Sequence, residues 1–236
     1  MDSKSVDAGR GVNWWTDSWA LFMKNPGMWI VLGLVVIVIG VVLNFVPFIG
    51  GLAFALVMPA FIGSWMLAAR KLEGGGTLEV GDLFLGFQGQ QLTPLLVLGA
   101  LSLAASAVVF VIMGVFGFGA VMGMGVGAGM HSGMGALAAM GAGLIGLLVG
   151  LALFVPITMA FWFAPALVVF DGVAPVDAIK ASFAACLRNV MPFLVYGVLG
   201  LVASVIASIP FGLGWIVLLP LMGLTVYLSY RDIYGR

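Results

Sequence analysis

Residues 28–46 read MWIVLGLVVIVIGVVLNFV, and this apolar run decides the class of fold. A helix of this length measures about 28 Å, close to the thickness of the hydrocarbon core of a bilayer. An ionised side chain at the bilayer centre costs about 3 kcal/mol, and the run contains none. The sequence therefore predicts a transmembrane helix at this position.

The charged residues of the chain lie in four short stretches. The three blocks between these stretches, residues 25–69, 83–170 and 189–230, contain no Lys, Arg, Asp or Glu. All nine basic residues fall within the four stretches, and Lys and Arg are enriched in the cytoplasmic loops of membrane proteins. We therefore expect all four stretches to be cytoplasmic and each block to cross the membrane and return.

The predicted fold class is an all-α integral membrane protein with six transmembrane helices and both termini in the cytoplasm. We expect residues 1–236 to form a single multi-pass transmembrane domain, and the lipid bilayer is the first expected partner. The composition agrees, because 63% of the residues are apolar and only 8% are charged, outside the range of soluble proteins. The formal net charge is zero, so nucleic acid is not an expected partner.

A unit made of one interfacial helix and a kinked helical hairpin recurs along the chain. SWALFMKN at residues 18–25 matches SFAACLRN at residues 182–189, and each stretch precedes a predicted span. Two crossings per unit make the repeats parallel, in agreement with the charge pattern. We expect the interfacial helices to lie in the headgroup layer or, alternatively, to dock a partner. The predicted repeats cover about residues 13–72, 79–171 and 175–233.

Four prolines inside the predicted spans are candidate kink and pocket positions: Pro59, Pro156, Pro165 and Pro220. A proline within a helix removes one backbone hydrogen bond and frees the carbonyl four residues earlier. If the repeats pack around a pseudo-threefold axis, the freed carbonyls would line a central polar pocket. The alternative is that the kinks only shape the helical bundle.

The middle block is about 30 residues longer than two spans require, and the surplus is an insertion at residues 113–143, predicted to be extracytoplasmic. It is rich in Gly, Ala and Met. Thioether and imidazole groups are soft ligands that suit copper(I), so copper is a candidate cofactor; otherwise none is expected. The alternatives are a flexible or membrane-associated cap and a helical packing surface. The candidate metal ligands are Met122, Met124, Met130, His131 and Met134.

Catalysis requires ionisable or nucleophilic groups that can meet, and the predicted spans contain no Asp, Glu, Lys, Arg or His. We therefore expect no enzyme. The acidic residues near turns, namely Glu79, Asp82, Asp171 and Asp177, are predicted to cap helices. The single cysteine, Cys186, is expected to be a small, reduced packing residue.

Several runs in the second half of the chain resemble a proteobacterial family of hypothetical six-helix inner-membrane proteins of unknown function. These runs are AFWFAPAL at residues 160–167, PFLVYG at 192–197 and YLSYRDI at 227–233. The layout is more distantly similar to the membrane domain of some glycerophosphodiester phosphodiesterases. The resemblance implies a location in the bacterial inner (cytoplasmic) membrane and supplies no catalytic residues.

Three hypotheses about function follow from these observations. The leading one is a non-enzymatic structural or accessory subunit that binds a membrane-protein partner or forms a homo-oligomer. The second is a facilitator or channel for a small neutral or amphipathic molecule, which the kinked repeats suggest. The third is extracytoplasmic copper handling by the Met-rich insertion.

Overall fold

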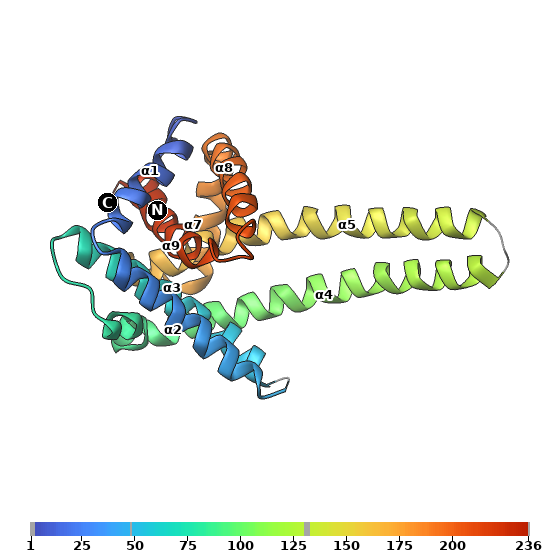
Figure 1. The fold of residues 1–236 in the computed structure, drawn as a ribbon, viewed down its shortest axis with the longest axis horizontal. Coiled ribbons are helices and arrows are strands. Elements are labelled where there is room, and N and C mark those ends of the chain that lie inside the picture. Colours follow the sequence, from blue (N-terminus) through green and yellow to red (C-terminus); the bar gives the residue numbers. More distant parts are fainter. Residues whose placement is uncertain (1–2, 48, 130–132, 236) are drawn as a thin grey trace. The chain divides into compact units, whose positions relative to one another are not determined.

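The computed structural model describes residues 3–47, 49–129 and 133–235, apart from the side chains of residues 116–140 and 142. Within these ranges every regular element is a helix (Figure 1). The chain divides into two compact units, which are treated separately below. The first consists of Met1–Ala100 with Met159–Arg236, and the second of Leu101–Thr158.

Six of the described segments are long and apolar enough to span a membrane, which confirms the predicted number of spans. They are Pro26–Asn44, Ile49–Glu73, Gly89–Val115, Gly143–Asp171, Val190–Ser208 and Trp215–Tyr234. The elements in chain order are α1 (Arg10–Phe22), α2 (Pro26–Asn44), α3 (Ile49–Glu73), the 3-10 helices η1 (Val80–Phe87) and η2 (Gly89–Gln91), α4 (Leu92–Gly129), α5 (Gly133–Trp162), α6 (Ala164–Asp171), α7 (Pro175–Arg188), α8 (Val190–Ser208) and α9 (Trp215–Tyr234).

Local sequence explains where several helices begin and end. The Oδ1 atom of Asn25 accepts a hydrogen bond from the Met28 N–H at 3.2 Å, so Asn25 caps the start of α2. The predicted break near Pro165 is confirmed, because α5 ends at Trp162 and Pro165 lies in the first turn of α6. Gly172 ends α6 with a positive φ of 63°, a conformation that glycine adopts at low cost.

The second amphipathic segment is a 3-10 helix rather than the expected regular interfacial helix. The Asp82 carboxylate accepts the Glu79 N–H at 2.8 Å, which confirms capping by Asp82. Gly86 lies against α3, where a Cβ atom would come within 2.2 Å of the Ala60 carbonyl oxygen. Glycines disfavour the α-helix, and this close approach to α3 suits the tighter 3-10 turn.

The three amphipathic segments pack in a cyclic order within the first unit. η1 packs on α3, α7 packs on α6, and α1 packs on α9. The first two therefore lie against the spanning helix that precedes them in the chain, while α1 lies against the last one. This is the order that a closed threefold arrangement would produce, although the repeat itself stays a prediction.

The two ends of the chain lie together. The backbone N–H of Lys4 donates to the Ile233 carbonyl at 2.7 Å. The Asn189 side chain accepts the Val6 N–H at 2.8 Å and donates to the Lys4 carbonyl at 2.9 Å. The first contact joins the N-terminal segment to α9, and the other two join it to Asn189 at the start of α8, so the two terminal segments lie side by side.

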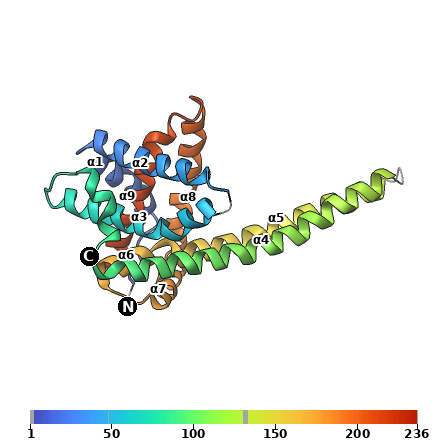
Figure 2. The same cartoon turned by 90° about the horizontal axis from the view of Figure 1, so that it is seen from below.

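The second unit is an antiparallel hairpin formed by parts of α4 and α5 (Figures 1 and 2). The whole of α4 has 38 residues and α5 has 30. At about 1.5 Å per residue these helices measure about 57 Å and about 45 Å. Both are longer than the hydrocarbon core, which is about 30 Å thick. The backbone is thus helical through most of the predicted insertion.

We predict that Gly99→Ala destabilises the protein while Gly114→Ala, in the same helix, does not. A Cβ atom at position 99 would lie 1.9 Å from the Leu56 carbonyl oxygen of α3, whereas nothing lies within 4 Å of one at position 114. Overpacking of this kind costs about 1–3 kcal/mol. Thermal unfolding in detergent, followed by circular dichroism, should show a lower midpoint for Gly99→Ala only. Equal midpoints would contradict the close α3–α4 contact.

Candidate functional site

The C-terminal ends of α3, α6 and α9 meet in a group of charged residues and tyrosines, here named the span-end cluster. The Glu73 carboxylate of α3 accepts a hydrogen bond from the Tyr227 hydroxyl at 2.7 Å and forms an ion pair with Arg231. The Tyr230 hydroxyl donates to the Asp171 carboxylate of α6. The cluster consists of Arg70, Glu73, Asp171, Tyr227, Tyr230 and Arg231.

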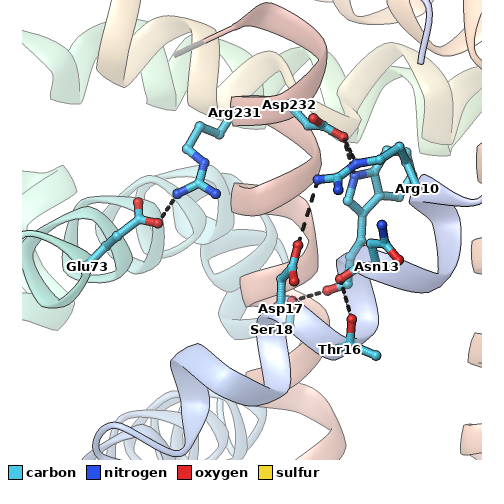
Figure 3. Close-up of polar contacts among 9 residues, drawn as sticks. Arg10, Asn13, Thr16, Asp17, Ser18, Glu73, Arg231 and Asp232 are labelled. Carbon is cyan, nitrogen blue, oxygen red and sulfur yellow. Dashed lines mark hydrogen bonds and ion pairs between the residues drawn. The ribbon is translucent and has the colours of Figure 1, made fainter. Parts of the chain in front are cut away.

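Adjacent residues of α9 reach opposite neighbours (Figure 3). Arg231 points to Glu73 on α3, while Asp232 points to α1. The Asp232 carboxylate accepts from Arg10 Nε at 2.6 Å and from Trp14 Nε1 at 3.1 Å. Residues of a single turn of α9 therefore contact both the spanning helix α3 and the amphipathic helix α1.

These contacts assign the acidic residues mainly structural roles. The side chains of Glu73 and Arg231 are only 32% and 37% exposed, so each loses much of its hydration and depends on its partner. Asp171, which was predicted to cap a helix, connects α6 with α9 through Tyr230. Asp177 lies in the first turn of α7, but no side chain forms a capping hydrogen bond there, so capping by Asp177 stays a prediction.

A cleft of about 1,090 Å³ opens beside the span-end cluster, between α3, the η1–η2–α4 connection and the end of α6. We call it the Arg70 cleft. Its lining includes two cationic side chains, three glutamines and no carboxylate. The lining residues are Leu67, Arg70, Lys71, Gly74, Leu85, Gln88, Gly89, Gln90, Gln91, Pro94, Val168, Val169, Gly172, Val173 and Ala174.

The two cations of the cleft have different surroundings. Lys71 Nζ lies 2.8 Å and 3.0 Å from the two carboxylate oxygens of Asp82, so its charge is compensated. The Arg70 guanidinium lies over the Phe170 ring, 4.5 Å from the ring centroid. Among the ion pairs of the described residues, Arg70 takes part in none.

The four candidate prolines do not line the Arg70 cleft. Pro59, Pro156 and Pro220 are inside α3, α5 and α9, and Pro59 and Pro220 are buried. The Arg70 cleft is lined by Pro94 and by none of the four predicted prolines. A central pocket formed by freed carbonyls stays a prediction.

The candidate metal ligands are only partly covered by the structure. Met122 and Met124 belong to α4 and Met134 to α5, as backbone positions. Met130 and His131 lie outside the described residues. Within the part of the chain that was searched, no three His, Cys, Asp or Glu side chains are close enough to share a metal ion. The copper hypothesis stays a prediction.

The sequence analysis did not identify the residues of the Arg70 cleft as a site. A signal was present, since Arg70 and Lys71 end one charge-free block and Gln90 and Gln91 lie near the start of the next. What the pattern could not show was that these ends lie together with the end of α6.

Six apolar helices whose charged residues gather at the helix ends define an integral membrane protein. The chain is similar to a probable inner membrane protein of Burkholderia thailandensis, with 31% identity over 230 residues that cover 96% of this chain and 84% of that protein. The chain belongs to the family of that inner membrane protein. No family model matches the chain, so the likeness to glycerophosphodiester phosphodiesterases has no support. No solved structure matches it either.

We predict that Cys186 is chemically inert in the folded protein. The residue is 2% exposed, and burial raises the pKa of the thiol to about 12. Because the thiolate is the reactive form, alkylation by N-ethylmaleimide at about pH 8 should be at least about 100-fold slower than for an exposed thiol. The matched control is Ala184→Cys in a Cys186→Ala background, since Ala184 is exposed on the same helix.

The same pKa shift predicts a pH dependence. The neutral thiol is favoured in the folded state, so its contribution to stability is complete below the ordinary pKa of 9.0. This contribution is lost as the pH rises from 9.0 through about 12. Cys186→Ala should flatten the stability profile in this window, and rapid alkylation of the native protein would show that Cys186 is not buried.

We predict energetic coupling between Glu73 and Arg231. Glu73→Gln and Arg231→Gln should each lower the unfolding midpoint, and the double variant should lose less than their sum. A coupling free energy of about 1 kcal/mol is expected for a half-buried pair. Asp177 and Lys180 are the control, because their side chains are 70% and 74% exposed and lie 3.9 Å apart. Additive losses at Glu73 and Arg231 would show that the pair does not couple α3 to α9.

Proposed function

We propose that this protein is a non-enzymatic integral protein of the bacterial inner membrane and acts as a structural or accessory subunit. It would contact a second membrane protein or another copy of itself. The observation that carries the proposal is the α4–α5 hairpin, which is longer than a bilayer is thick and carries no charged side chain.

The hairpin has a composition that does not suit exposure to water. Within residues 113–143 the polar side chains are those of His131 and Ser132. At about 57 Å, α4 exceeds the hydrocarbon core by about 27 Å. Apolar surface of that extent usually meets another protein or lipid.

The glycines of α4 strengthen this argument. Each glycine in a helix costs about 1 kcal/mol relative to alanine, so a helix this rich in glycine needs stabilising contacts from outside. Small residues spaced four apart allow helices to approach closely in membranes. A covering protein would supply these contacts. The glycines in the outer part of α4 are Gly117, Gly119, Gly123, Gly125, Gly127 and Gly129.

Other observations support the remaining parts of the proposal. The similarity to a probable inner membrane protein of Burkholderia thailandensis supports an inner-membrane location. The distribution of Lys and Arg favours cytoplasmic termini, and the contact between Lys4 and Ile233 is consistent with both ends on one side. The acids of the span-end cluster bind neighbouring helices, which supports a structural rather than a catalytic role.

Site-specific photocrosslinking in native membranes tests the proposal. A photoreactive amino acid at position 128 or 136, in the hairpin, should produce a discrete protein adduct. The control is position 202 on α8, where Val202 is 51% exposed and is expected to meet lipid. Adducts with lipid alone at all three positions would rule out a subunit role for the hairpin. A protein adduct that equals twice the mass of the chain would identify self-association.

A further inference from the structure

We propose that the Arg70 cleft binds the phosphodiester headgroup of an anionic phospholipid such as phosphatidylglycerol. This inference is independent of the proposed function, because the cleft belongs to the first unit and the hairpin forms the second. It rests on the position of the cleft at the span ends, on its charge and on its apolar wall.

The cleft lies where candidate spans end. Leu67, Arg70 and Lys71 come from the last turns of Ile49–Glu73, and Gln90 and Gln91 from the beginning of Gly89–Val115. A third span, Gly143–Asp171, contributes its last turn through residues 168 and 169. Helices that cross a bilayer end at the headgroup layer, so the cleft opens at the depth of lipid phosphates.

The charge of the cleft favours an anion. Arg70 is held by the Phe170 ring, and a guanidinium stacked on an aromatic face still has its N–H groups directed outward in its own plane. No carboxylate lines the cleft, and Lys71 is already paired with Asp82. Arg70 therefore supplies a positive charge that forms no ion pair within the described residues, and its planar guanidinium can bind two phosphate oxygens at once.

Two further groups add to the anion site. Gln88 and Gln90 are exposed lining residues, and their amide groups can donate hydrogen bonds. The 38-residue helix α4 begins at Leu92, directly after the lining residue Gln91. The partial positive charge at a helix N-terminus favours a nearby anion.

The apolar part of the wall distinguishes a lipid from free phosphate. Leu67, Leu85, Val168 and Val169 lie in the lining together with Arg70. An inorganic anion would leave these side chains uncovered, whereas the glycerol and the first methylenes of a phospholipid would cover them. The volume of about 1,090 Å³ is sufficient for a ligand of drug-like size.

Native mass spectrometry of the full-length protein tests the proposal. The protein in mild detergent is mixed with equal amounts of phosphatidylglycerol and phosphatidylcholine that have the same acyl chains. The wild type should retain phosphatidylglycerol preferentially, and Arg70→Gln should reduce this preference about tenfold, the effect expected for a lost charge-assisted contact. Equal retention of the two lipids by the wild type would overturn the proposal.

Two variants keep the result interpretable. Gln90→Glu places a negative charge in the cleft at an exposed position and should also weaken the preference, so the test stands even if Arg70→Gln fails to fold. Lys180→Gln removes an exposed cation outside the cleft, with a side chain that is 74% exposed, and should leave the preference unchanged. An equal loss in Lys180→Gln and Arg70→Gln would indicate general charge attraction and would refute a specific site.

Competition with inorganic phosphate distinguishes a lipid headgroup from free phosphate as the ligand of the Arg70 cleft. Added at millimolar concentration with ionic strength held constant, it should not displace phosphatidylglycerol, because it cannot cover the apolar wall. Displacement that disappears in Arg70→Gln would identify free phosphate as the ligand and would overturn the assignment to lipid.

Discussion

The exclusion of ionised side chains from hydrocarbon is the constraint on which the rest of this structure depends. It confines charged side chains to the helix ends, where a carboxylate or a guanidinium can still contact water and lipid headgroups. At the ends of α3, α6 and α9 these groups pair with one another, through Glu73 with Arg231 and through Asp171 with Tyr230. Residues that cannot enter the bilayer thus hold together the helices that cross it.

A second level of organisation comes from the amphipathic segments. Each packs on a spanning helix, and α1 reaches α9 from the other end of the chain through Arg10 and Trp14 on Asp232. This contact joins the first and the last helix of the chain within the first unit. Arg70 belongs to both the span-end cluster and the Arg70 cleft, and its guanidinium stacks on the Phe170 ring and forms no ion pair within the described residues.

Two asparagines at matching positions of the predicted first and third repeats show what sequence reasoning can and cannot predict. Asn25 and Asn189 occupy matching positions and precede spanning helices. Asn25 caps α2 as a local rule predicts. Asn189 instead binds the backbone of Lys4 and Val6 and the Ala185 carbonyl. The difference arises from a distant segment of the chain, which no local pattern indicates.

The sequence by itself determined the number of spans, the break at Pro165 and the confinement of charge to the helix ends, because hydrophobicity and proline geometry act locally. Only the tertiary structure decided which ends meet. The pairing of Glu73 with Arg231 and the joining of Arg70 and Gln90 in one cleft depend on residues far apart in the chain. Such contacts follow from how the helices pack, and packing depends on the shapes of all the facing side chains together.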